Sequence, residues 1–342
     1  MRLRFGFIVG CLCFALALVG HSFAEPIVLT LSDQNSDVSW GPVHATQIWA
    51  KKVEEATKGM VKIQIYPSQT LAKGNQGWQA TKSGICDMSW NVMAYYPGMA
   101  PYSDVVLLPG LPFRTGEKGS EVIWKLYEKY PELSKQFAEN KVLILYTSHP
   151  FVLMTSKKQV KTLEDVKGLK IRTVGGPPVD QMKALGANPV LLPMPDCYLA
   201  MEKGTIDGLQ AAYEPIPGYR LQEVVKYIVE APLGPSLFGV VMNNKKFDGL
   251  PKDIQDAIMS VSGLEGSKFF GKNFFDSAKE PIKKMAEEGK FDIKITELSD
   301  QERRRWVDQS CKPIWEEWVK KMEKNGYSKA REILNAAVEL SK

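Results

Sequence analysis

Arg172 is the residue whose type and position most clearly suggest a chemical role. It lies near the end of a predicted strand over residues 170–173, between Ile171 and the apolar pair Val174 and Gly175. A guanidinium is planar, stays charged at physiological pH and can pair with a carboxylate through two parallel hydrogen bonds. An arginine at a strand end is more often a plain surface residue, so Arg172 alone leaves both roles open.

Motifs of catalysis and metal binding are missing from the sequence. It has no Gly-x-Ser-x-Gly motif, its three histidines are not paired at metal-ligand spacing, and residues 74–77 lack the Lys-Ser/Thr of a phosphate-binding loop. Cys86, Cys197 and Cys311 show no Cys-x-x-Cys spacing, and we predict buried free thiols, with one disulfide as the alternative. We therefore expect no catalytic residue, no metal and no cofactor.

The N-terminus indicates export. Arg2 and Arg4 precede an apolar run over residues 5–20, and Ser22 and Ala24 are small residues at the positions that a signal peptidase reads. The run is shorter than the ~20 residues of a membrane anchor, so we predict a signal peptide, residues 1–24, cleaved after Ala24, and a periplasmic mature chain. Cleavage lowers the net charge from +5 to +3 by removing two arginines. This mild, unclustered excess argues against nucleic-acid binding.

Strand and helix patterns alternate along the mature chain. Strands are predicted over residues 27–31, 61–65, 87–90, 142–146, 151–155 and 170–173, and helices over 45–56, 75–83, 179–185, 301–324 and 328–340, with a largely helical stretch from 251 to 288. This order predicts an α/β protein with helices on both faces of open sheets, and the length predicts two domains. Ligands of such sheets bind beyond the carboxyl ends of the strands.

A short internal repeat supports two similar domains. Residues 82–87 and 202–207 each close a helix and open a strand with a Gly-x-x-Asp sequence that ends at Asp87 and Asp207. Chance could supply so short a match. Two similarly wound domains that face each other would also produce it, and the strands after Asp87 and Asp207 would then point at a common cleft.

Six stretches in register resemble the DctP-type solute receptors of TRAP transporters. They cover residues 27 to about 335 in family-like order: 61–69, 104–112, 166–172, 186–189 with 198–201, 204–208, and 240–247 with 250–251. The Gly-Thr-Ile-Asp-Gly sequence of residues 204–208 is the most recognisable of them. No single stretch is enough to indicate the family, but the occurrence of all six in the family's order is.

The resemblance implies a two-lobed periplasmic-binding-protein clamshell with crossover strands and a long C-terminal helix that spans both lobes. The implied lobes are residues 25–148 plus 239–280 and residues 149–238 plus 281–342. Such a receptor has no catalytic activity. It closes on a small organic acid and delivers it to the membrane permease subunits of a TRAP transporter. We expect a monomer that binds no nucleic acid.

The resemblance also assigns Arg172 to the ligand's carboxylate. Further candidate ligand-binding residues lie in loops and at strand ends that face the expected cleft: Trp40, Trp90, Asn91, His149, Met194, Gln210 and Tyr213. For each of these residues, the alternative to ligand binding is a structural role in the core or at a strand end. No second arginine is evident near His149, which favours a monocarboxylate, and two Trp with Tyr213 would form an apolar, aromatic wall. Gln210 and Ala211 stand where many relatives carry an Asn, or an acidic residue followed by Trp, so a second polar contact from this strand is less certain and the acidic cation ligand of some relatives is absent.

Two other functions stay open at this point. A two-lobed periplasmic enzyme would need catalytic motifs that the sequence does not offer. A periplasmic sensor would bind the same ligands but signal to a membrane protein. Neighbouring genes for a small and a large multi-spanning protein would favour transport, and a neighbouring sensor kinase alone would favour signalling.

Overall fold

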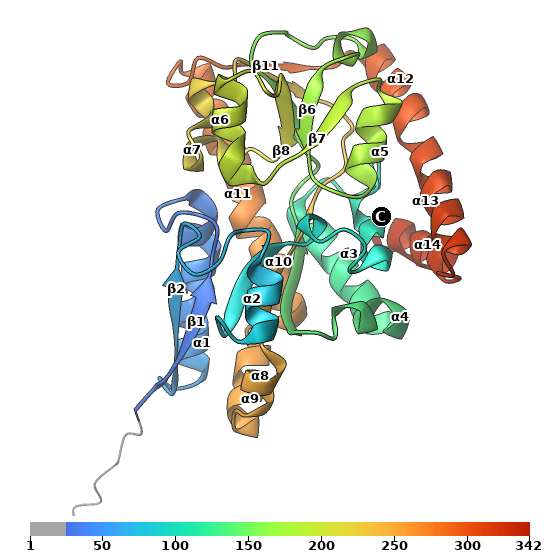
Figure 1. The fold of residues 1–342 in the computed structure, drawn as a ribbon. Coiled ribbons are helices and arrows are strands. Elements are labelled where there is room, and N and C mark those ends of the chain that lie inside the picture. Colours follow the sequence, from blue (N-terminus) through green and yellow to red (C-terminus); the bar gives the residue numbers. More distant parts are fainter. Residues whose placement is uncertain (1–24) are drawn as a thin grey trace, which may run out of the picture.

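The computed structural model describes residues 25–342, which form two lobes, each built on its own β-sheet (Figure 1). The predicted signal peptide and its cleavage site lie outside the described residues. The α/β clamshell predicted from the sequence is confirmed. In the described chain no helix is both long and apolar enough to cross a membrane. Cys86, Cys197 and Cys311 are buried free thiols, as predicted.

The first lobe holds a five-stranded sheet in the order β2-β1-β3-β10-β4. Its strands are β1 (Ile27–Ser32), β2 (Val61–Tyr66), β3 (Met88–Val92), β4 (Lys141–Thr147) and β10 (Leu237–Met242). β1 pairs in parallel with β2 and β3, whereas β10 runs antiparallel to β3 and β4. β3 and β10 are buried along their whole length, as strands covered on both faces are. At the edge, β2 alternates buried and exposed positions.

The second lobe holds a six-stranded sheet in the order β11-β9-β5-β8-β6-β7. Its strands are β5 (Val152–Thr155), β6 (Lys170–Thr173), β7 (Asn188–Leu191), β8 (Gly208–Ala211), β9 (Tyr227–Glu230) and β11 (Lys294–Glu297). β6 lies parallel to both β7 and β8. The predicted strand over residues 170–173 is therefore confirmed, and it lies inside the sheet, which buries Arg172.

Helices cover both sheets. In the first lobe they are α1 (Gln47–Ala56), α2 (Gly77–Ser83), α3 (Gly116–Lys129), α4 (Pro131–Ser134), α8 (Asn244–Asp248), α9 (Lys252–Ser260) and α10 (Gly263–Phe270). The others are α5 (Pro177–Ala184), α6 (Cys197–Glu202), α7 (Pro215–Gly218), α11 (Ser277–Glu287), α12 (Asp300–Ser310), α13 (Lys312–Lys324) and α14 (Ala330–Leu340). α13 packs on α5 of the second lobe, and α14 on α3 of the first. The exact limits of the two lobes stay a prediction.

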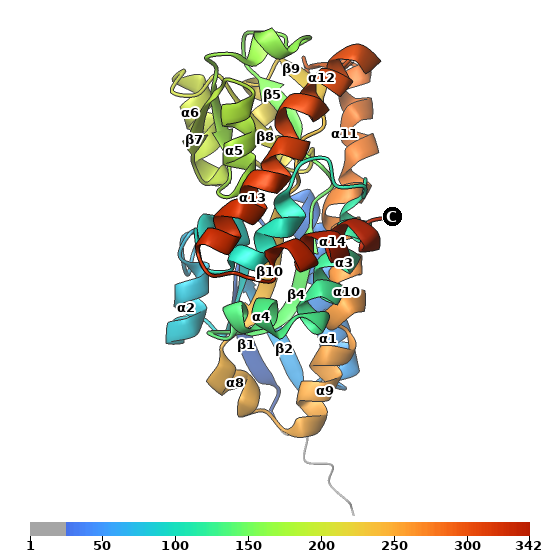
Figure 2. The same ribbon diagram turned by 90° about the vertical axis from the view of Figure 1, so that its right-hand side faces the viewer.

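One long helix connects the lobes. α10, a π-helical stretch (Gly271–Asp276) and α11 follow one another without a break, and Figure 2 shows them running along both lobes. α10 packs on β4 and α11 on β11. Asp276 fixes the helix to the start of α3, because its carboxylate accepts hydrogen bonds from the backbone N–H groups of Gly116 (2.7 Å) and Glu117 (2.9 Å). The chain also crosses between the sheets in two segments, one directly after β4 and one directly before β10. A hydrogen bond from the N–H of Ser148 to the carbonyl of Ser236 joins these two segments.

The short internal repeat makes the same hydrogen bond in both lobes. Asp87 Oδ2 accepts a hydrogen bond of 2.8 Å from the N–H of Thr30 in β1, and Asp207 Oδ2 accepts one of 2.8 Å from the N–H of Lys170 in β6. Each aspartate immediately precedes a strand that pairs in parallel with the strand it holds. β3 and β8 consequently end at the space between the lobes, where the sequence predicted a common cleft.

Candidate functional site

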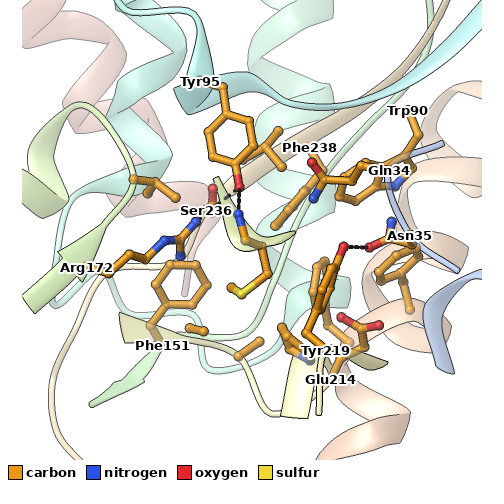
Figure 3. Close-up of a pocket in the computed structure, with 18 residues that line it drawn as sticks. Gln34, Asn35, Trp90, Tyr95, Phe151, Arg172, Glu214, Tyr219, Ser236 and Phe238 are labelled. Atoms are coloured by element: carbon orange, nitrogen blue, oxygen red, sulfur yellow. Dashed lines mark hydrogen bonds between the residues drawn. The ribbon is translucent and has the colours of Figure 1, made fainter. Parts of the chain in front are cut away.

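A cavity lies between the two sheets (Figure 3). The first lobe contributes Trp90 and Val92 from β3 and Phe238 from β10, and the second lobe contributes Arg172 from β6 and Ala211 from β8. The remaining lining residues come from loops and helix ends: Gln34, Asn35, Tyr95, Phe151, Val174, Met194, Ala212, Glu214, Pro215, Tyr219, Ser236, Phe274 and Phe275. Arg172 is the only basic residue among them.

Arg172 is 1% exposed and held by neutral oxygen atoms. Its Nε donates to the carbonyl of Leu192 (2.7 Å), Nη1 to the carbonyl of Gln210 (3.3 Å) and Nη2 to the hydroxyl of Tyr95 (3.1 Å). A guanidinium has five N–H groups, so one N–H remains on each of Nη1 and Nη2. No ion pair within residues 25–342 includes Arg172. A buried charge without a counter-charge is costly, so this cavity favours an incoming anion.

Tyr95 connects the two lobes beside Arg172. It ends a short 3₁₀ turn, Met93–Tyr95, that follows β3 of the first lobe. Its hydroxyl oxygen accepts hydrogen bonds from Arg172 Nη2 (3.1 Å) and from the N–H of Met194 (2.8 Å), both in the second lobe. Burial raises the pKa of Tyr95, so the hydroxyl keeps its proton. That proton can be donated to an anion in the cavity. The buried Oγ of Ser236, also in the cavity wall, has no hydrogen-bond partner in the described part of the chain.

Aromatic side chains form most of the remaining wall. The indole N–H of Trp90 donates to Tyr146 Oη (2.6 Å), which satisfies its polar edge inside the first lobe. Its ring stacks on Phe274, with centroids 5.5 Å apart, and packs against Phe238 at 5.4 Å. Phe274 and Phe275 come from the π-helical stretch of the long connecting helix. The cavity therefore presents ring surfaces to whatever lies beside Arg172.

A second polar group of residues lies on the side of the cavity away from Arg172 (Figure 3). Tyr219 Oη donates to Asn35 Oδ1 (2.7 Å), and Asn35 Nδ2 donates to Asp33 Oδ1 (2.8 Å). Glu214 is 2% exposed, and its Oε1 accepts one long hydrogen bond of 3.4 Å from the N–H of Gly41. Burial raises the pKa of Glu214 to about 8 and that of Asp33 to about 7.

Of the eight ligand-binding residues predicted from the sequence, the structure brings Arg172, Trp90 and Met194 to the cavity. Asn91 and Gln210 face the opposite way, because neighbouring residues of a strand alternate between its two faces. Asn91 Nδ2 donates to Ser89 Oγ (2.8 Å), and Gln210 Nε2 donates to Thr173 Oγ1 (2.8 Å). Their side chains are therefore parts of the core beside the site.

Three further predicted residues also lie outside the cavity lining. Tyr213 Oη donates to Glu230 Oε1 (2.9 Å), and Trp40 Nε1 donates to Ser277 Oγ (2.9 Å). His149 Nδ1 lies 2.8 Å from the carbonyl of Pro150, and burial lowers the pKa of its ring to about 4. All three side chains make contacts within the protein. Tyr213 is fully buried, so its hydroxyl is not the solvent-facing group of the alternative interpretation, and the buried Nε2 of His149 has no partner among residues 25–342.

The buried carboxyl of Glu214 predicts a pH-dependent stability. Glu214 ionises near 4.5 in an unfolded chain but keeps its proton up to about pH 8 in the fold. Its contribution to stability is therefore complete below pH 4.5 and is lost as the pH rises towards 8. We expect Glu214→Gln to melt at nearly the wild-type temperature at pH 4.5 and roughly 3 °C or more above it at pH 8. Differential scanning calorimetry measures this, and an equal change at both pH values would contradict it.

Comparisons with known proteins agree with this architecture. Residues 41–322 match the family model described as bacterial extracellular solute-binding protein, family 7. A solute-binding protein of Albidiferax ferrireducens is 31% identical over 280 residues, which cover 80% of each chain.

Solved structures of TRAP solute-binding proteins share the fold. One from Rhodoferax ferrireducens, with copurified benzoate, has a TM-score of 0.86 and 26% identity, covering 92% of this chain and 97% of that one. One from Bordetella bronchiseptica, with bound mandelate, has a TM-score of 0.85 and 25% identity, covering 92% and 99%. The chain belongs to family 7 of the bacterial extracellular solute-binding proteins. It is a binding protein and not an enzyme, which confirms the resemblance seen in the sequence.

Proposed function

We propose that this receptor binds a small monocarboxylate with an aromatic body, and that Arg172 holds the carboxylate. The observation that carries this proposal is a buried guanidinium without a carboxylate partner, with one unused N–H on each Nη, at the wall of an aromatic cavity. A bidentate pair with a carboxylate would neutralise Arg172 and use both groups. The absence of a second basic residue among the lining residues favours one carboxylate over two.

The ring surfaces support an aromatic body for the ligand. Phe238 and Phe274 both pack against Trp90, so the three rings are fixed before a ligand arrives. Aromatic pairs gain about 0.5–1.5 kcal/mol beyond the burial of their surface. The relatives with bound benzoate and mandelate, both aromatic acids, are consistent with this choice.

Export, closure and delivery complete the proposed function. The ligand contacts both lobes only when they are closed, so its binding shifts the population towards the closed form. We propose that the periplasmic, closed receptor is what a TRAP permease recognises. Tyr95 couples closure to Arg172, because its hydroxyl is bonded to the second lobe while its ring belongs to the first.

A thermal-shift screen against a library of carboxylates, followed by calorimetry, tests this function. Aromatic monocarboxylates should raise the melting temperature by mass action, and sugar acids and dicarboxylates should raise it less. Aromatic amides and alcohols of the same shape serve as controls. A set of ligands without carboxylates would overturn the proposal.

Replacement of Tyr95 by phenylalanine tests the connection between the lobes. It removes one hydroxyl and leaves Arg172 Nη2 and the N–H of Met194 without their partner in the closed form. An unpartnered buried group costs about 1–3 kcal/mol, so we expect affinity for an aromatic acid to fall by about 5- to 150-fold in calorimetry.

Tyr96→Phe is the matched control. Tyr96 Oη is also hydrogen-bonded, to Asn91 Oδ1 (2.8 Å), but within the first lobe. Tyr96→Phe should therefore keep near-native affinity. Equal losses for the two variants would show that the hydroxyl of Tyr95 acts only on the stability of the first lobe.

A further inference from the structure

We propose that Glu214 and Tyr219 form a second polar subsite that binds a hydroxyl group at the end of the ligand opposite its carboxylate. The inference rests on the proposed function, because it takes Arg172 to hold the carboxylate. It narrows the ligand from aromatic monocarboxylates in general to those that carry a hydroxyl.

Glu214 is the group that most needs a partner. It is 2% exposed and lines the cavity, yet its only hydrogen bond within residues 25–342 is the long one from the N–H of Gly41 to Oε1. None of the described residues donates to or accepts from Oε2. Buried polar groups are almost always hydrogen-bonded, and a carboxyl left facing an apolar ligand would be desolvated without compensation. A ligand atom that enters the cavity can supply the missing partner.

Tyr219 determines which kind of group fits. Its hydroxyl proton is committed to Asn35 Oδ1 at 2.7 Å, so towards the cavity the oxygen can only accept. Asn35 itself is occupied on both sides, by Tyr219 and by Asp33. The subsite therefore offers an acceptor at Tyr219 Oη and a carboxyl at Glu214. A hydroxyl can donate to the first and accept from the second at once.

The charge balance favours a hydroxyl over an ammonium group. A ligand carboxylate and Arg172 neutralise each other, and Arg172 is the only basic residue in the cavity wall. Burial keeps Glu214 protonated at neutral pH. The carboxyl of Asp33, behind Asn35, is also buried, with Oδ2 unpartnered. A neutral hydroxyl fits beside the protonated carboxyl of Glu214, and Figure 3 places Glu214 and Tyr219 on the side away from Arg172.

Calorimetry with pairs of acids that differ by one hydroxyl tests the subsite. The probes are benzoate and phenylacetate, their 3-hydroxy and 4-hydroxy derivatives, and 3-(aminomethyl)benzoate. We expect at least one hydroxylated acid to bind tenfold or more tightly than its parent, because the parent leaves Glu214 and Tyr219 unpartnered. In Glu214→Leu this advantage of the hydroxylated acid over its parent should fall to less than about threefold.

Two variants complete the experiment. Glu214→Gln keeps a donor and an acceptor and should retain most of the preference for the hydroxyl. Glu223→Gln, an exposed acid nearby in the chain, should behave as wild type. Tightest binding of the aminomethyl acid, lost in Glu214→Gln, would overturn the proposal in favour of a cation subsite. Equal binding of parent and hydroxylated acids would overturn it while leaving the proposed function standing, whereas the proposed function itself fails if none of the carboxylates binds.

Discussion

Replacement of Arg172 by alanine is expected to weaken the binding of an aromatic monocarboxylate by at least about 100-fold. Alanine removes the only basic group of the cavity wall, so the carboxylate would be buried without a counter-charge. It also leaves the carbonyls of Leu192 and Gln210 without their donors. Isothermal titration calorimetry measures the affinity, and calorimetric melting shows whether the variant is folded.

Arg172→Lys separates the shape of the group from its charge. An ammonium carries the same charge but has three donors at one point, and it cannot reach Leu192, Gln210 and Tyr95 while also pairing two ways with a carboxylate. We therefore expect Arg172→Lys to lose nearly as much affinity as Arg172→Ala. Arg220→Ala, at an exposed arginine paired with Glu223, is the control and should bind normally. Near-native affinity of a folded Arg172→Ala would refute the carboxylate assignment.

Gly271→Ala is expected to destabilise the fold by about 3 kcal/mol or more, which is a large effect for one methyl group. A Cβ at position 271 would lie 2.3 Å from the carbonyl oxygen of Gly116 and 2.4 Å from Ser120 Oγ. The first of these atoms belongs to the backbone of α3 and cannot rotate away. The long connecting helix would therefore have to move away from α3, and the hydrogen bonds from Gly116 and Glu117 to Asp276 would be strained.

Gly249→Ala is the matched control for this prediction. Gly249 (φ −77°) and Gly271 (φ −52°) both have backbone angles that alanine adopts without strain. At Gly249 the nearest atom to a new Cβ is 3.1 Å away, so a cost below about 1 kcal/mol is expected in urea unfolding. Gly271→Ala should also bind ligand more weakly, because Phe274 and Phe275 lie on the same helix. Equal stabilities of the two variants would show that α3 and the helix separate easily.

The sequence predicts the fold well because its signals are strong there. Lys170–Thr173 is a strand as predicted. In the Gly-x-x-Asp repeat, Asp87 and Asp207 each accept a hydrogen bond from a backbone N–H of the neighbouring strand. The helices of the C-terminal third follow a clear helical period. The short strands β9 and β11 have few residues and mixed polarity, so no pattern distinguishes them from loops.

The site is less predictable from the sequence, for two physical reasons. Trp90 and Asn91 are neighbours in a strand and cannot both face the cavity, and the structure places only Trp90 of the two in its lining. The alternation alone could have shown this. Tyr95 lies in a short turn after β3, and Glu214 and Tyr219 flank the one-turn helix α7, where no periodicity shows the direction of a side chain. Only the folded structure brings the three residues to the same cavity as Arg172.

The hydrogen bonds that join the lobes around the cavity also have a consequence for kinetics. Tyr95 with Met194, and Asn35 with Tyr219, connect the first lobe to the second over the buried side chains of the cavity. A bound acid can leave only after these contacts break, so lobe opening sets an upper limit on its dissociation rate. Tight ligands should then differ from weak ones chiefly in the lifetime of the closed complex. That lifetime is the time available for an encounter with a permease.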